Sequence, residues 1–137
     1  MCTNFRLKAK DNSVVVGRTM EFGIDLQSKI TVFPRAFKFQ GTGPNNKPGL
    51  SWQGKYGFVG MDVIGMPVVS DGLNEVGLYV GDLYLPGFAE YQTVPEGEEA
   101  KAMSPLDVAG YLLSLCATVE EAKEAIVKKV GGKMTNT

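Results

Sequence analysis

The chain of 137 residues contains no histidine, one tryptophan and only two cysteines, Cys2 and Cys116. The absence of histidine excludes the Ser-His-Asp and Cys-His arrangements of many hydrolases, together with zinc sites that use histidine ligands. The spacing of the two cysteines matches neither a disulfide framework nor a metal site. We therefore expect no metal and no cofactor, and a nucleophile in this chain needs a base other than imidazole.

The chain also lacks an excess of basic residues and long apolar runs. Its net charge is −1, with 21% charged residues, which argues against nucleic acid as a partner. Apolar runs such as residues 111–113 are far too short to cross a bilayer, and the first residues do not form a signal peptide. We expect a cytoplasmic protein that does not bind membranes, or a periplasmic one if a leader has been removed.

The length is that of a single domain, residues 1–137, able to bury a core without disulfides or metals. Residues 3–10 alternate, with Phe5, Leu7 and Ala9 on one face, which predicts a half-buried strand. Turn residues at 11–13 and a return strand from 14 to 18 complete a hairpin. This hairpin is expected to bring Arg18 back towards Cys2.

Further β-structure is predicted at residues 29–39, 56–64 and 68–85. Pro34 interrupts the first of these segments, and the glycine and Asn/Asp density at 71–77 indicates a tight connection inside the last. Residues 41–48 and 86–102 are predicted to be loops.

Two helices follow the strands. Ser104 and Pro105 are typical of a helix start, and Thr118 with Glu121 forms a capping box at the next one, which we expect to stop at Gly131. Strands followed by helices indicate an α+β layered domain. The expected buried positions are Leu106, Ala109, Leu113 and Cys116 on the first helix and Val119, Ala122, Ile126 and Val130 on the second.

Cys2 becomes the first residue of the chain once Met1 is removed. Its thiol and its own α-amine then belong to one residue. The unperturbed pKa of an α-amine is about 7.7–8.0, against about 10.4 for lysine, so part of it is unprotonated near neutral pH. The α-amine can therefore serve as the base that histidine provides elsewhere.

Four motifs in order along the chain resemble the choloylglycine hydrolases, a family that includes bile salt hydrolases and penicillin V acylases. They are Met-Cys-Thr at the start and the segments at residues 17–22, 55–61 and 70–78. The resemblance implies a four-layer αββα Ntn-hydrolase fold, with antiparallel sheets and two C-terminal helices in this portion. It also implies cleavage of a linear, non-peptide amide bond.

The resemblance assigns roles to four residues. Cys2 matches the family nucleophile, and Arg18 matches the arginine beside the thiol. Glu21 stands where the family usually carries the aspartate that orients the α-amine. Tyr84 matches a position whose backbone N–H lines the oxyanion hole; penicillin V acylases carry tyrosine there and bile salt hydrolases asparagine, so Tyr84 favours an acylase.

Four apolar residues near strand ends are candidates for the substrate pocket, with a place in the core as the alternative: Met20, Phe22, Ile64 and Met66. Trp52 either stacks on an aromatic acyl group or packs beneath a loop. The glutamates Glu96, Glu98 and Glu99 are interpreted as solvated surface rather than a cation site.

The resemblance covers only the amino-terminal portion of the family. A second oxyanion-hole asparagine and a further active-site arginine belong to the portion that this chain lacks. Either the chain is a fragment or a second chain or downstream segment completes the fold, which we expect to be a homo-oligomer when complete. The predicted function is hydrolysis of an N-acylated small molecule, penicillin V acylase-like. The alternatives are a conjugated bile salt hydrolase, a catalytically incomplete fragment, or a binding domain with the same fold.

Overall fold

A computed structural model describes residues 2–85 and 87–130, without the side chains of Lys129 and Val130. The chain divides into two compact units. The first comprises Met1–Leu26 and Leu83–Glu90, and the second comprises Gln27–Asp82 and Tyr91–Thr137. Each unit is described by itself.

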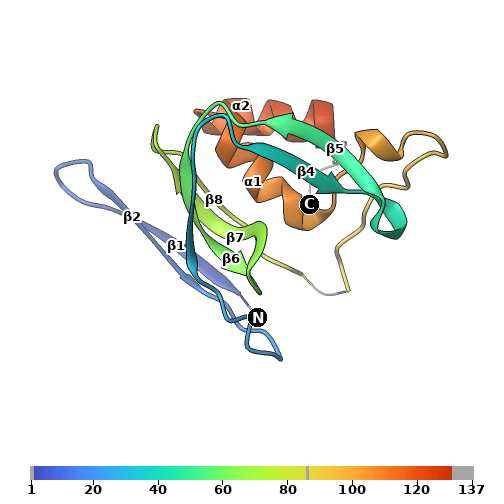
Figure 1. Cartoon of the computed structure of the whole chain (residues 1–137). Helices are drawn as coiled ribbons and strands as arrows, with labels where there is room; N and C mark the ends of the chain where they lie inside the picture. The colour runs from blue at the N-terminus through green and yellow to red at the C-terminus, as the bar shows by residue number, and fades with distance from the viewer. Residues whose placement is uncertain (1, 86, 131–137) are drawn as a thin grey trace. The chain divides into compact units, whose positions relative to one another are not determined.

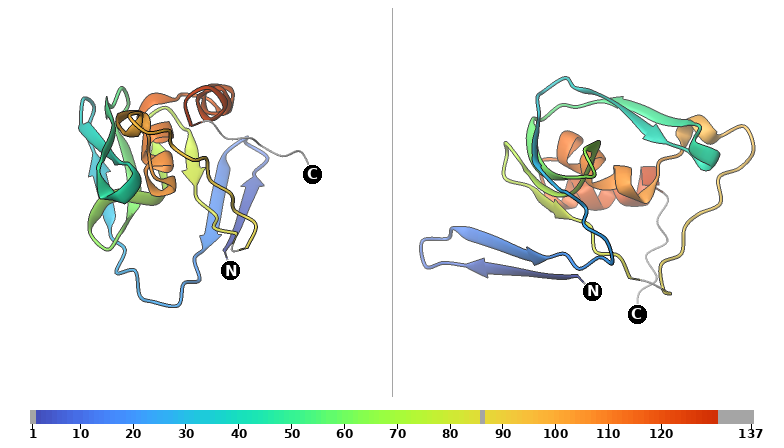
Figure 2. Two further views of the ribbon diagram at one scale, coloured as in Figure 1. Left: turned by 90° about the vertical axis from the view of Figure 1, so that its right-hand side faces the viewer. Right: turned by 60° about the horizontal axis from the view of Figure 1, so that its bottom comes forward.

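The first unit is built on an antiparallel hairpin of β1, Thr3–Lys8, and β2, Val14–Thr19. Both strands are drawn in blue and form a long ribbon (Figure 2). At the turn, the carboxylate of Asp11 accepts hydrogen bonds from the backbone N–H and the hydroxyl of Ser13, at 3.0 and 2.7 Å. The predicted hairpin is confirmed, and its register runs from Thr3 opposite Thr19 to Lys8 opposite Val14.

The register separates the hairpin into two faces. Phe5 lies opposite Gly17 and Leu7 opposite Val15, so these residues share an apolar face. The prediction that this face is buried is wrong for the chain as described, because the side chains of Phe5 and Leu7 are 50% and 61% exposed. A two-stranded ribbon has too little surface to bury its own apolar side chains.

The second unit contains a four-stranded antiparallel sheet and a separate hairpin. The sheet has the order β3-β6-β7-β8, and β4 pairs with β5 in the separate hairpin. The labels of β4 to β8 locate these strands in Figure 1. The predicted break at Pro34 is confirmed, since it separates β3 from β4. The strands are β3 (Ile30–Phe33), β4 (Lys38–Thr42), β5 (Pro48–Gln53), β6 (Phe58–Val63), β7 (Met66–Asn74) and β8 (Tyr79–Gly81).

Two helices follow in the second unit: α1, Pro105–Leu115, and α2, Val119–Ala125, which continues as a π-helical turn, Ile126–Val130. Short 3₁₀ turns lie at Pro44–Asn46 and Glu99–Lys101. Helix α1 packs against β7 and β8. The antiparallel sheets and two helices confirm the α+β class.

The core of the second unit lies between the sheet and α1. Phe33 stacks on Phe58 with ring centroids 4.6 Å apart, and Phe39 stacks on Trp52 at 5.0 Å. The indole N–H of Trp52 donates to the hydroxyl of Ser114 at 3.0 Å. Of the two readings of Trp52, the structure therefore supports packing within the core.

Both helix starts are confirmed, with some differences in burial. Cys116 is buried as expected, but Leu106 and Val119 are 49% and 68% exposed, against the prediction. Thr118 Oγ1 accepts the N–H of Glu121 at 3.2 Å, which confirms the second cap. The side chain of Val130 and the predicted stop at Gly131 lie outside the described residues.

The tight connection predicted at residues 71–77 is placed too early. Asp71 and Gly72 lie inside β7, and the turn begins at Asn74, with Gly77 at a φ of +91°. Close packing requires glycine at position 72, because a Cβ there would stand 2.6 Å from the carbonyl oxygen of Val59 and 2.8 Å from Leu113 Cδ1. This glycine allows α1 to approach the sheet, rather than allowing the chain to turn.

Asn74 joins this turn to the end of α1. Its Nδ2 donates to the carbonyl oxygens of Leu113 and Cys116 at 3.0 and 2.8 Å, and its Oδ1 accepts the N–H groups of Val76 and Leu78 at 3.2 and 2.8 Å. The side chain is 3% exposed. Asn74 therefore satisfies the last carbonyls of the helix in addition to shaping the turn.

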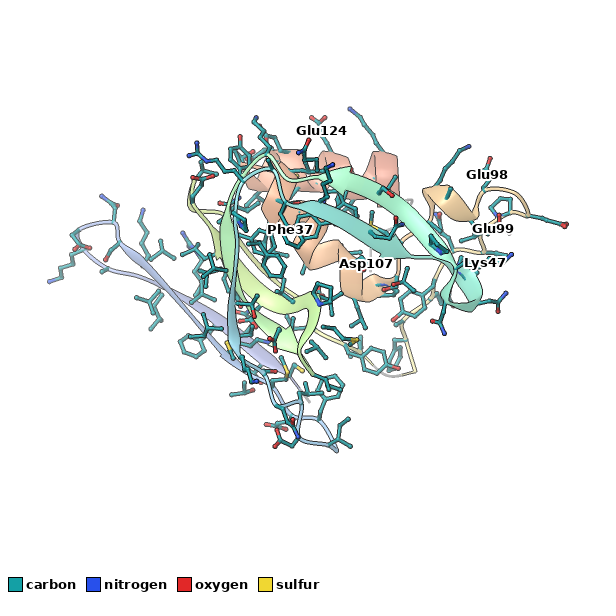
Figure 3. All side chains as sticks on the ribbon, viewed as in Figure 1. Phe37, Lys47, Glu98, Glu99, Asp107 and Glu124 are labelled. Carbon is teal, nitrogen blue, oxygen red and sulfur yellow. The ribbon has the colours of Figure 1, made fainter. Side chains whose placement is uncertain are left out.

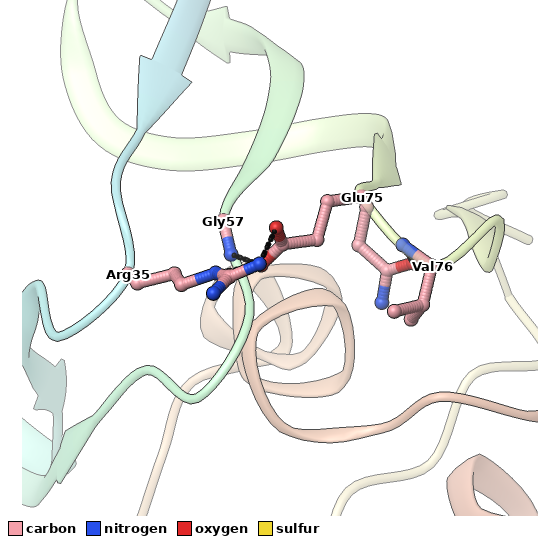
Figure 4. Close-up of polar contacts among 5 residues, drawn as sticks. Arg35, Gly57, Glu75 and Val76 are labelled. Carbon is pink, nitrogen blue, oxygen red and sulfur yellow. Dashed lines mark hydrogen bonds and ion pairs between the residues drawn. The ribbon is translucent and has the colours of Figure 1, made fainter.

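The neighbouring Glu75 forms an ion pair with Arg35, and its Oε1 also accepts the N–H of Gly57 at 2.8 Å (Figure 4). The guanidinium of Arg35 and the N–H of Gly57 lower the pKa of Glu75 to about 2. This contact links the segment after β3 to the turn after β7.

The acidic residues around the second 3₁₀ turn form ion pairs with lysines. Glu99 faces Lys47 at 3.7 Å (Figure 3). Glu98 faces Lys101 at 3.1 Å. Within residues 2–85 and 87–130, no group of three or more Cys, Asp or Glu side chains is arranged to hold a metal ion. Within the same residues, no helix has the length and hydropathy needed to span a membrane.

Candidate active site

The candidate active site lies at the open end of the first unit's hairpin. Cys2 immediately precedes β1, and Arg18 pairs with Asn4 in the register. Residues two apart on one strand share a face, so Cys2 and Arg18 form a diagonal pair across the ribbon. Arg18 Nη2 donates to Cys2 Sγ at 4.0 Å. The predicted return of Arg18 towards Cys2 is thus present in the geometry.

The surroundings of Cys2 favour the thiolate. Partial burial raises the pKa of the Cys2 thiol, but this is outweighed by the backbone N–H of Glu21 and the guanidinium of Arg18, so the pKa is lowered overall. A thiolate is the nucleophilic form of cysteine. Cys116 provides a contrast within the same chain: it is 4% exposed, and burial together with the charge of Glu121 raises the pKa of its thiol.

The backbone of Glu21 contributes to the site, and the role of its carboxylate towards the α-amine stays a prediction. Its N–H approaches the sulfur of Cys2, whereas its side chain is exposed. Met20 is half-buried and Phe22 is exposed, and both belong to the segment that leaves β2 beside Cys2.

Tyr84 belongs to the same compact unit as Cys2, in the segment Leu83–Glu90. Its side chain is exposed. The backbone N–H at this position remains a prediction as an oxyanion donor.

Ile64 and Met66 belong to the second unit, at the turn between β6 and β7. Both are exposed, so neither is a core residue in the described chain. Ile64 adopts a φ of +54° and Gly65 one of +67°, the conformation of a tight hairpin turn. Their role in a pocket stays a prediction.

One residue near the thiol was missed by sequence reasoning. The hydroxyl of Thr19 accepts the backbone N–H of Thr3 at 3.1 Å, directly beside Cys2 and Arg18. The pairing of Thr3 with Thr19 at the end of an alternating hairpin is the signal that would have found it.

Solved structures that resemble this chain include an acylase and two variants of a hydrolase. Penicillin V acylase from Agrobacterium tumefaciens is 30% identical with a TM-score of 0.74, covering 93% of this chain and 38% of that one. The C2A mutant of conjugated bile acid hydrolase from Clostridium perfringens is 30% identical with a TM-score of 0.75, covering 95% and 38%. The R18L variant of that hydrolase is 28% identical with a TM-score of 0.72, covering 93% and 38%.

The sheets and helices thus form part of the α+β fold of the Ntn hydrolases. Residues 2–131 match the linear amide C–N hydrolases of the choloylglycine hydrolase family, and the chain belongs to that family.

Curated relatives agree with this assignment. The bile salt hydrolase/transferase of Clostridium perfringens is 33% identical over 131 residues, which cover 92% of this chain and 37% of that protein. The penicillin V acylase of Pectobacterium atrosepticum is 29% identical over 116 residues, which cover 82% and 30%. The chain therefore spans about a third of the length of these two relatives.

Proposed function

We propose that this chain carries the nucleophile of an amidohydrolase that cleaves the linear amide of an N-acylated small molecule. The observation that carries the proposal is the contact of Cys2 Sγ with Arg18 Nη2 at 4.0 Å, in surroundings that lower the pKa of the thiol. Structures of relatives include variants with the substitutions C2A and R18L, which match this pair in residue type and number.

In the proposed mechanism, the α-amine of Cys2, freed by removal of Met1, takes the thiol proton. Cys2 Sγ then attacks the amide carbonyl, and the charge develops on its oxygen. Collapse of this intermediate breaks the C–N bond; the leaving amine takes the proton from the α-ammonium, and a thioester remains on Cys2. Water hydrolyses the thioester, which yields the acid and restores the thiol. Arg18 stabilises the thiolate and does not exchange a proton.

The backbone N–H of Tyr84 is the proposed donor for the oxyanion. Loss of one such donor costs about 10²–10³ in rate, so a site with an incomplete set of donors is slow. The resemblance puts the other donor in the part of the fold that this chain lacks.

An apolar face of the four-stranded sheet supports the proposal that further polypeptide completes the fold. The register aligns Val32, Val59, Leu73 and Tyr79 in one row across all four strands. Val32 and Leu73 are 73% and 48% exposed. An uncovered apolar row of this kind is typical of a face that packs against another layer. We propose a downstream segment or second chain as that layer, and a homo-oligomer for the complete protein.

Penicillin V or a related acyl amide is the proposed substrate, because Tyr84 stands where acylases carry tyrosine. A conjugated bile salt is the second candidate, favoured by the 33% identity to the bile salt hydrolase/transferase. The ratio of kcat/KM for penicillin V and for a glycine-conjugated bile salt decides between them. A ratio in favour of the bile salt would overturn the inference from Tyr84.

Two measurements of amide hydrolysis test the proposal. The first uses the 137 residues alone, and the second follows addition of the polypeptide that relatives carry beyond the matched region. We expect little turnover alone and turnover after completion. Cys2→Ala should abolish it, whereas Cys116→Ala, in a protein that remains folded, should not. Unchanged turnover by the Cys2→Ala protein would remove Cys2 from the chemistry.

A further inference from the structure

The side chain of Thr19 joins the two strands of the first unit at their open end. Its Oγ1 accepts the N–H of Thr3 at 3.1 Å, and these two residues form the last pair of the hairpin. Thr19 lies on the face with Phe5 and Leu7, whereas Arg18 and Cys2 share the other face. Any effect of Thr19 on the thiol must therefore pass through the backbone.

The N–H of Thr3 that donates to Thr19 belongs to the peptide bond between Cys2 and Thr3. This unit runs from the Cα of Cys2 to the Cα of Thr3 and is planar and rigid. A hydrogen bond to its N–H therefore also restrains the orientation of the Cα of Cys2. Cys2 precedes the first residue of β1, so the strand pairing does not include it.

Both contacts that stabilise the sulfur come from the segment around Thr19. Arg18, one residue before it, provides the guanidinium, and Glu21, two residues after it, provides the backbone N–H. The bond between Thr19 and Thr3 ties this segment to the peptide group of Cys2. Without it, the end of the hairpin is free to fray, as unrestrained chain termini do.

We propose that Thr19 is a positioning residue for the Cys2 thiol, holding the sulfur against Arg18 and the N–H of Glu21. As a contribution to catalysis this role rests on the proposed function. As a contribution to thiol reactivity it does not.

The experiment measures the rate at which iodoacetamide alkylates Cys2 in the 137-residue chain after removal of Met1. Rates are taken across pH 5 to 10, and peptide masses separate Cys2 from Cys116. Thr19→Val removes the acceptor at nearly constant shape, and Thr19→Ser retains it. Thr3→Val is the matched control, because it leaves the N–H of Thr3 in place.

Loosening the contacts that lower the pKa of Cys2 raises that pKa and reduces the thiolate near neutral pH. We expect Thr19→Val to react about 3–10-fold more slowly at pH 7, the range that one lost hydrogen bond allows. The rates should converge at high pH, where the thiol is ionised in every variant. Thr19→Ser and Thr3→Val should follow the parent protein.

A Thr19→Val profile that superimposes on the parent would overturn the proposal, and so would an equal slowing by Thr3→Val. Thermal unfolding verifies that each protein is folded during the assay; if Thr19→Val is not, the comparison of Thr19→Ala with Thr19→Ser replaces it. Hydrolysis by the completed protein is read separately. A Cys2→Ala protein that still hydrolyses amide would refute the proposed function while the alkylation result stands.

Discussion

Asn74 is expected to be among the most sensitive positions of the second unit. Its side chain makes four hydrogen bonds, two to the last turn of α1 and two to the turn after β7. At a net contribution of about 0.5–1.5 kcal/mol each, these bonds sum to roughly 2–6 kcal/mol. In the Asn74→Ala protein, water can replace some of the hydrogen bonds at the turn, so the expected loss lies in the lower half of this range. We expect Asn74→Ala to lower the free energy of unfolding by about 3 kcal/mol, a large share of a typical 5–15 kcal/mol.

Urea denaturation followed by circular dichroism measures this loss. With a slope of about 1–3 kcal/mol/M, the midpoint should fall by roughly 1–3 M. Asn74→Asp should lose at least as much at pH 7, because it keeps the acceptor but puts a carboxylate oxygen against the carbonyls of Leu113 and Cys116. Gln53→Ala, which removes one exposed hydrogen bond to Ala36, is the control, with a change of about 0.5 kcal/mol or less. A loss below about 1 kcal/mol for Asn74→Ala would refute the reasoning.

Gly72→Ala should destabilise the protein by about 1–3 kcal/mol, because its Cβ would overlap with Val59 and Leu113. Gly110→Ala in α1 meets no atom within 4 Å and should stabilise by about 0.5–1 kcal/mol; equal effects in chemical denaturation would contradict the packing account. Glu75→Gln should be less stable than the parent above about pH 4.5. Because the pKa of Glu75 is lowered to about 2, the difference in stability between the parent and Glu75→Gln should disappear as the pH falls towards 2. A difference in melting temperature that stays constant with pH would argue against the ion pair.

Short-range patterns predicted the hairpin and the helix starts. Alternation identified β1 and β2, and Ser104 and Thr118 identified α1 and α2, because strand alternation and capping depend on residues close together in the sequence. The same local reading misplaced the turn at 71–77. This reading assigned Gly72 to a turn. A glycine is needed there because Leu113, forty-one positions further along the chain, packs against it.

The candidate site was predictable where hairpin register governs it. The register alone brings Arg18 to Cys2. The same register pairs Thr19 with Thr3, whereas the contact of the Glu21 backbone with the thiol depends on the path of the chain after β2. The residue type of Glu21 does not indicate such a contact, since a backbone N–H is common to all residues but proline.

The most direct test of the central claim is the mass of the covalent intermediate on the completed protein, measured after rapid acid quenching during turnover of an acyl amide. We expect one acyl group per chain, bound to Cys2, and only on chains that have lost Met1. We expect no adduct on the Cys2→Ala protein. An acyl group on chains that retain Met1, or turnover with the acyl group on another residue, would contradict the claim that Cys2 and its own α-amine perform the reaction.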